Sequence, residues 1–156
     1  MHTPDQHPAT AFLRCLGVEE TLLTEALAIA DDVSAALRSG DIASAIAATT
    51  RQRTLAGELA AAGMTRTASA NALAQHLDLP NAGLTLSLLA ERLPAPFADD
   101  VRAARERLAG LTSRFAAVQT RNANLLGHLR SFFRGVLADL APTDAPVRYG
   151  PSGSRV

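Results

Sequence analysis

The chain has 156 residues and a formal net charge of zero, a length that suits one compact domain or one elongated bundle. The balanced charge counts against a nucleic-acid-binding protein, because neutralising phosphates normally requires a basic excess. The 32 alanines, the use of Arg for all 15 basic residues and the low aromatic content favour helices over a β-sandwich.

Redox and targeting features predict a cytoplasmic protein. The single cysteine, Cys15, cannot form an internal disulfide, which is typical of a reducing compartment. The N-terminal residues lack a basic segment followed by an apolar one, so no secretory signal is predicted. The sequence has no run of about 18 uncharged apolar residues, and we therefore expect no stable insertion into a membrane.

Helical periodicity begins after a short N-terminal segment. Residues 1–9 contain two prolines and no periodic pattern, and we expect them to form a flexible lead-in before a single helical domain over residues 10–140. A first helix is predicted over residues 10–39, and Gly40 suits the left-handed residue that ends it. Its apolar stripe comprises Phe12, Leu16, Leu23, Ala26, Ala30, Val33 and Leu37.

A second helix is predicted over residues 41–62. Asp41 is suited to cap its first turn, and the short connection requires the two helices to be antiparallel. We expect Gly63 to interrupt this helix and residues 67–93 to form short helices. The predicted inward face comprises Ile42, Ala45, Ile46, Thr49, Gln52, Leu55, Ala56 and Leu59.

A long helix over residues 97–139 has the strongest periodic signal in the chain. Asp99 and Asp100 lie in its first turn, where negative charge complements the helix dipole. At about 1.5 Å per residue the helix is about 65 Å long, so it needs the first two helices as partners. After it, residues 141–156 are rich in Pro and Gly and predict a flexible tail. The heptad positions are Phe97, Val101, Ala104, Leu108, Leu111, Phe115, Val118, Asn122, Leu125, Leu129, Phe132 and Val136.

The charges of the first and last helices are complementary. Six acidic residues and two Arg precede Gly40, whereas five Arg and no acidic residue lie from Arg107 to Leu137. The two helices are therefore expected to lie side by side, although each exposed ion pair contributes little.

Several polar residues have both a functional and a structural interpretation. Asn122, at a core heptad position, either fixes the register of the bundle or faces solvent where the bundle opens. His128 lacks the Lys-Gly signature of a phosphotransfer domain. Residues 73–93 are read as a short helical hairpin that caps the bundle, because a DNA-recognition helix needs basic or amide side chains facing the groove and the candidate here has Gly83, several Leu and only Arg92 at its end. His2, His7 and His76 have no metal-ligand spacing, and no catalytic motif is present, so we expect neither an enzyme nor a metal or other cofactor.

The apolar stripe of the long helix widens after Asn122. A narrow stripe serves one helical partner and a wide one implies a second. Either residues 67–93 cover the additional surface, or it binds an incoming amphipathic helix, and the nearby Arg114, Arg121, Arg130 and Arg134 favour an acidic one. The candidate binding residues are Asn122, Leu125, Leu126, Leu129, Phe132, Phe133, Val136, Leu137 and Leu140.

Three segments of the sequence resemble the flagellar export chaperone family FlgN. Asn122-Ala-Asn-Leu-Leu126 is similar to the Asn-x-x-Leu-Leu/Ile stretch of its last long helix. The sequence from Arg148 to Gly153 resembles the family's terminal Tyr-Gly-Pro-Asp-Gly element, with Ser152 where Asp is common. Residues 84–94 resemble the short helix that precedes the last long helix in this family.

The resemblance implies a type III secretion chaperone in the cytoplasm. Such a chaperone binds hook–filament junction proteins, of the FlgK and FlgL type, and passes them to the flagellar export apparatus. Because the family binds clients through its C-terminal helix and tail, the resemblance also implies a role for Tyr149. It implies no enzymatic activity.

The sequence as a whole predicts an all-α protein, an elongated antiparallel helical bundle or coiled-coil hairpin with a long C-terminal helix. Two other functions stay open at this point. One is a regulatory binding module of the helix-turn-helix or phosphotransfer type, and the other is a structural coiled-coil oligomer.

Overall fold

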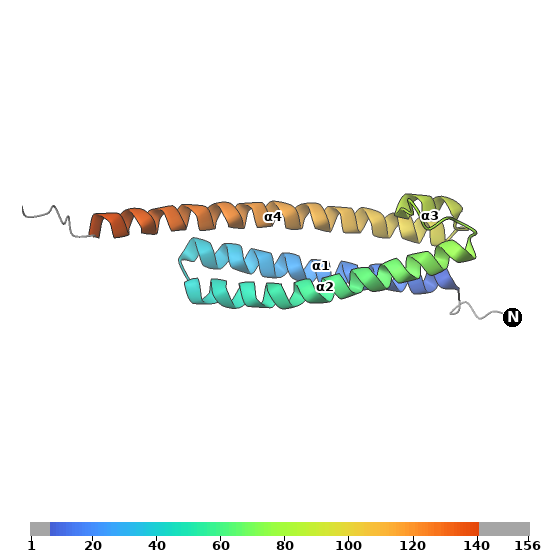
Figure 1. The fold of residues 1–156 in the computed structure, drawn as a ribbon, viewed down its shortest axis with the longest axis horizontal. Coiled ribbons are helices and arrows are strands. Elements are labelled where there is room, and N and C mark those ends of the chain that lie inside the picture. The colour runs from blue at the N-terminus through green and yellow to red at the C-terminus, as the bar shows by residue number, and fades with distance from the viewer. Residues whose placement is uncertain (1–6, 141–156) are drawn as a thin grey trace, which may run out of the picture.

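The computed structural model of the chain describes residues 7–140, with side chains up to residue 138. This part of the chain consists of four helices and their connections: α1 (Pro8–Ser39), α2 (Ile42–His76), α3 (Leu86–Arg92) and α4 (Phe97–Leu140). Helix α1 packs along both α2 and α4 (Figure 1). The predicted all-α bundle with a long C-terminal helix is therefore confirmed. None of the described helices is both long enough and apolar enough to cross a membrane.

The turn between α1 and α2 has the predicted chemistry. Gly40 adopts the left-handed conformation, with φ of 75°, and its N–H contacts the last carbonyls of α1. The Asp41 carboxylate then accepts a hydrogen bond from the Ser44 N–H at 3.0 Å, which caps α2. The two helices are consequently antiparallel (Figure 1).

Helices α1 and α4 run parallel with a constant register. Glu20 accepts a hydrogen bond from Arg107 at 2.8 Å, and Asp31 accepts one from Arg121 at 3.1 Å. The partners are separated by 87 and 90 positions. A parallel pair keeps this separation almost constant, whereas an antiparallel pair would change it at every contact. The predicted pairing of an acidic first helix with a basic last helix is thus confirmed.

The core is divided along the length of the molecule. The first cluster joins the start of α1, the end of α2, all of α3 and the start of α4, and its largest members are Phe12, Leu16, Leu73, Leu89 and Val101. The second lies near the α1–α2 turn and includes Ile29, Val33, Leu37 and Leu55. Between them, Leu27 and Ala30 pack on Val118. Because the core is a series of clusters along three helices, the molecule is a rod (Figure 1).

Helix α2 continues through Gly63, so the predicted end at residue 62 was wrong. The helix stays in contact with α1 just after this glycine, where Arg66 Nε donates a hydrogen bond to Glu19 on α1 at 2.9 Å. The residue types that suggested a separate short helix before Leu79 instead form the last turns of α2. A single glycine lowers helix stability by only about 1 kcal/mol, which packing against a neighbour readily exceeds.

The start of α1 also lies earlier than predicted. His7 caps the helix, because its Nδ1 accepts the Ala9 N–H at 3.1 Å, and Pro8 occupies the first helical position. Ala9 is fully buried, and the His7 ring stacks on Phe97 with the ring centres 4.8 Å apart. The predicted lead-in of residues 1–9 was therefore too long by its last two residues. Residues 1–6 and the predicted tail, 141–156, lie outside the described residues.

Candidate functional site

The last turns of α4 have no partner within the described chain. The α1–α2 hairpin ends at its turn, whereas α4 continues past it (Figure 1). Leu129 is the last heptad residue that packs on the core near the turn, and every described residue from Arg130 to Ala138 is exposed. We refer to residues 130–138 as the free end of α4. It is a helix that presents its side chains to solvent on all sides.

Apolar side chains are concentrated on and beside this free end. Phe132 is 64% exposed and Leu137 is 67% exposed, values unusual for residues of this type. Phe132 and Phe133 contact each other edge to face, with ring centres 5.7 Å apart. The exposed large apolar residues of α4 are Leu126, Phe132, Phe133, Val136 and Leu137. An apolar cluster of this kind is typical of a protein-binding surface.

The other predicted binding residues on α4 lie in different environments. Asn122 is only 4% exposed, so its side chain is part of the bundle interior. Leu125 and Leu129 are partly buried against the core cluster near the turn. The side chain of Leu140 and the whole of Tyr149 lie outside the described residues. The structure therefore brings five of the predicted residues together on one exposed surface and places three inside or at the edge of the bundle.

Residues 67–93 do not cover the free end of α4. The end of α2 and all of α3 pack around Val101, in the first turns of α4. That region lies at the opposite end of the rod from Leu137 (Figure 1). The interpretation that this segment accounts for the widened apolar stripe is therefore wrong, because the two surfaces are separated by most of the length of α4.

A shallow groove of about 470 Å³ lies next to the free end. Helix α1 contributes Val33 and Leu37 to it, and α4 contributes Leu126. The wall from α2 consists of Ile42, Ala45, Ile46, Thr49, Thr50 and Arg53. Ile42 is 45% exposed and Ile46 is 63% exposed. The groove is thus a mainly apolar depression between α2 and α4 with α1 beneath it.

The prediction that Ile42 and Ile46 face the core was wrong. Ala45 and Leu55 of the predicted inward face are buried as expected, together with Ala48, which was not part of the prediction. The small side chains of Ala45 and Ala48 let α2 approach α1 closely, and the two larger isoleucines then face outward. The predicted stripe was therefore rotated toward the isoleucines by part of a turn.

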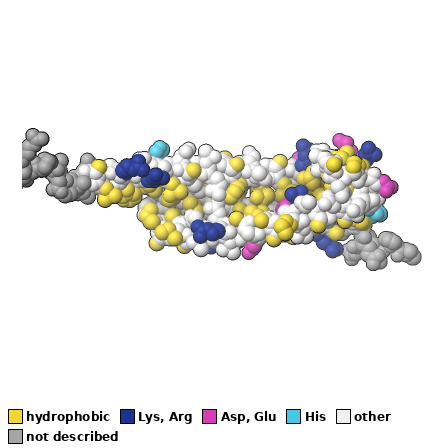
Figure 2. Space-filling view, viewed as in Figure 1, with side chains coloured by type: hydrophobic (Ala, Val, Ile, Leu, Met, Phe, Trp, Pro, Cys, Tyr) yellow, Lys and Arg dark blue, Asp and Glu magenta, His cyan; other side chains and the backbone are white. Residues whose placement is uncertain are grey.

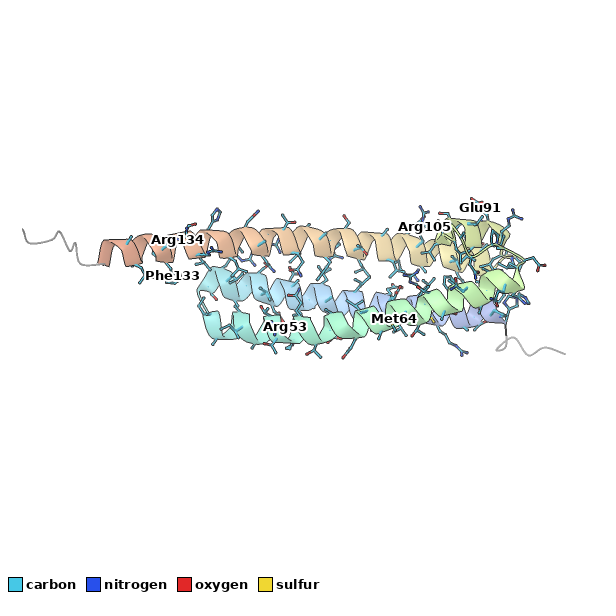
Figure 3. The ribbon with its side chains drawn as sticks, viewed as in Figure 1. Arg53, Met64, Glu91, Arg105, Phe133 and Arg134 are labelled. Carbon is cyan, nitrogen blue, oxygen red and sulfur yellow. The ribbon has the colours of Figure 1, made fainter. Side chains whose placement is uncertain are left out.

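Arginines border the groove and the free end without acidic partners. Arg53 lies on α2, and Arg134 lies on α4 near Phe133 (Figure 3). Neither they nor Arg130 form a hydrogen bond or an ion pair with a residue that the structure describes. Arg121 differs, since it is paired with Asp31. Figure 2 shows apolar side chains between two basic clusters at this end of the rod.

The nearest titratable group with a shifted pKa is Asp41 in the turn. Hydrogen bonds from the hydroxyl and the backbone N–H of Ser44 lower the pKa of its carboxyl group. Because these bonds belong to the helix cap, the shift reflects the structure of the turn rather than a reaction. Within residues 7–138 no three His, Cys, Asp or Glu side chains are grouped so as to hold a metal ion. The surface is suited to binding an apolar partner.

Comparison with known protein families identifies a match over most of the chain. A family described as FlgN protein matches residues 9–156. These residues include nearly all of α1, the whole of α2, α3 and α4, and the C-terminal residues beyond them. No curated protein and no solved structure matches the chain.

Proposed function

Because the chain belongs to the FlgN family, a family of flagellar chaperones and not of enzymes, we propose that it binds hook–filament junction proteins in the cytoplasm before their export. The clients are proteins of the FlgK and FlgL type. The chaperone keeps their apolar terminal helices from aggregating and passes them to the flagellar export apparatus. No covalent bond is made or broken.

The free end of α4 is the observation that carries this proposal. It is a helix with exposed aromatic and aliphatic side chains, and nothing else in the described chain reaches it. An incoming amphipathic helix would remove Leu126, Phe133 and Leu137 from water. Each such side chain contributes about 1–3 kcal/mol to binding when it is buried. The client would also be protected from aggregation, because its own apolar face stays covered until export.

The experiment is titration calorimetry of the purified chaperone with a hook–filament junction protein from the same bacterium. The double substitution Leu126→Ser with Phe133→Ser should weaken binding at least about tenfold, because it removes two apolar contacts at the centre of the surface. Circular dichroism should show little change in helix content or melting temperature, because both side chains are more than half exposed.

A matched control uses exposed apolar residues far from the free end. Val18 on α1 is 52% exposed and Met64 on α2 is 74% exposed, and Val18→Ser with Met64→Ser should leave binding unchanged. If the substitutions on α4 also leave binding unchanged while the fold is intact, the client site lies elsewhere. Substitution of Tyr149 is then the next test.

A further inference from the structure

The groove beside the free end has two walls, and only one of them belongs to α4. Leu126 forms the α4 wall, and Ile42 and Ile46 form the α2 wall, with Val33 and Leu37 of α1 between them. Leu126 lies seven residues before Phe133, and Leu137 lies four after it. These spacings place the three side chains on one face of the helix. The α4 wall of the groove therefore continues directly onto the free end.

The groove and the free end follow one another along the rod. Because α2 is antiparallel to α4, the segment from Ile42 to Arg53 extends about 16 Å from the α1–α2 turn along the body of the rod, whereas the segment from Leu126 to Leu137 extends about 16 Å in the other direction, past the turn. Both segments are helical throughout, and α1 packs on α2 and on α4 as far as Leu129. A groove with a helix beneath it and a helix on each side is the shape that accepts one further helix.

The charges at this surface indicate what kind of helix it accepts. Arg130 lies on the same face of α4 as Leu126 and Phe133, because it is four residues after one and three before the other. Arg53 lines the groove on the opposite wall. No carboxylate is among the residues that line the groove, and none lies between Arg130 and Ala138. A partner with acidic side chains beside its apolar stripe complements both walls.

A second copy of the chain does not fit this requirement. A symmetric dimer through this surface would place Arg53, Arg130 and Arg134 of one copy against the same three residues of the other. Like charges brought together on a shared apolar surface oppose association. The charge pattern therefore favours a different protein over self-association.

The chain's own C-terminal residues are also a poor match. Residues 141–156 contain three prolines, two glycines and two arginines but only one acidic side chain, Asp144. This sequence has no apolar stripe of helical period and brings further positive charge. Neither property complements the groove.

We propose that α2 takes part in client binding: one amphipathic client helix, with acidic residues beside its apolar stripe, lies between Ile42 and Ile46 on α2 and Leu126 on α4. It then continues along Phe133 and Leu137. This inference rests on the proposed function and adds to it a second wall and a charge preference. The client helix becomes the fourth long helix of the bundle at this end.

The test of the second wall uses Ile46→Gln, measured by titration calorimetry with the same junction protein. Gln keeps helix propensity and length but removes the apolar contact. We expect binding to weaken about fivefold or more, as for a typical anchor residue. Met64→Gln is the matched control, because Met64 lies exposed on the same helix (Figure 3), and it should leave binding unchanged.

The two proposals fail in different ways. Unchanged binding in Ile46→Gln, together with weakened binding in the double substitution on α4, would overturn the second wall and leave the proposed function intact. Unchanged binding in both variants would overturn both. If Ile46→Gln and Met64→Gln weakened binding equally, binding would depend on exposed apolar area anywhere on α2. That result would also contradict a specific role for the α2 wall of the groove.

The charge preference is tested by Arg53→Glu. This substitution should weaken binding about tenfold at low salt and reduce the salt dependence of the affinity. Arg105→Glu is the control, since Arg105 lies on α4 at the other end of the rod (Figure 3). Unchanged or tighter binding in Arg53→Glu would contradict the proposal that the client helix carries acidic residues. If the wild type were a dimer and Ile46→Gln were a monomer, the groove would bind a second copy of the chain. That result would overturn the inference.

Discussion

Ser34 on α1 and Asn122 on α4 form a hydrogen bond in the interior of the bundle, in which the Ser34 hydroxyl donates to the Asn122 side-chain oxygen. The Asn122 amide in turn donates to the Ala30 carbonyl at 2.8 Å. Both side chains are buried. A shift of α4 along α1 would leave these groups without partners, at a cost of about 1–3 kcal/mol each. The pair therefore fixes the parallel register of the two helices.

Loss of this pair should destabilise the fold. Asn122→Ala leaves the Ser34 hydroxyl without its acceptor, and we expect the free energy of unfolding to fall by about 1–3 kcal/mol. Urea unfolding followed by circular dichroism measures the change. Asn124→Ala is the control, because Asn124 is exposed on the same helix, and its effect should be small.

A double-mutant cycle separates the hydrogen bond from other effects. Ser34→Ala in the Asn122→Ala background should cost less than Ser34→Ala in the wild type, since its partner is already absent. If the losses in the free energy of unfolding of the two single variants add up to that of the double variant, the two residues act independently. The register would then be fixed by apolar packing alone.

Substitution of Phe by Ala should have very different effects on stability at two places on α4. Phe115 packs on both the middle core cluster and the one near the turn, so Phe115→Ala should lower the free energy of unfolding by about 2–3 kcal/mol, somewhat less than for a fully enclosed ring. Phe132→Ala, on the free end, should change it by less than about 0.5 kcal/mol. Thermal melts of both variants provide the comparison. Equal losses would mean that the free end is covered in solution.

Helix α4 shows how far its sequence pattern predicts structure. The heptad repeat runs from Phe97 to Val136 without a change of period, and it correctly predicts one continuous helix. Burial along it nevertheless ends at Leu129, because the α1–α2 hairpin ends there. The pattern specifies which face of α4 is apolar. How much of that face is buried depends on the length of the α1–α2 hairpin, which is set by a turn almost ninety residues earlier in the chain.

Helix α2 shows why the groove was not predicted. Ala45 can face inward together with Ile42 and Ile46 on one side of it or with Ala48 on the other, and the sequence alone favours the larger side chains. The closer approach to α1 that Ala permits determines the choice, and this depends on tertiary packing. The exposed α4 residues were predictable, because an apolar stripe wider than one partner needs is visible in the sequence.

The cap of α2 should make stability depend on pH. Because Ser44 lowers the pKa of Asp41 below its ordinary value of 3.8, the folded state favours the carboxylate. The stabilisation is present above the pKa of the unfolded chain and is lost as pH falls through the lower pKa of the folded chain. Asp41→Ala should therefore lower the melting temperature near neutral pH, and the difference from the wild type should shrink in acid.

Asp41→Ser provides the control for this prediction. Serine caps a helix without a charge, so its melting temperature should lie near that of the wild type at neutral pH and exceed it at the acid end. Other carboxylates contribute equally to all three proteins and cancel in the differences. A difference between Asp41→Ala and wild type that is the same at every pH would contradict the assigned cap.

Gly63 in α2 and Gly40 in the turn before it should respond in opposite ways to alanine. Gly63 lies inside a continuous helix, and an added Cβ would meet only the Glu19 side-chain oxygen at 3.6 Å, an ordinary contact distance. Gly63→Ala should raise the free energy of unfolding by about 0.4–1 kcal/mol, because alanine restricts the unfolded chain. Urea unfolding measures this gain.

Gly40→Ala has open space around the new methyl group as well, but its φ of 75° is unfavourable for any residue with a Cβ. We expect a loss of about 1–2 kcal/mol, so the two variants differ in sign although neither creates a clash. The comparison also tests the continuity of α2. If α2 were broken at Gly63, that position would need the conformational freedom of glycine, and Gly63→Ala would then destabilise the protein as Gly40→Ala does.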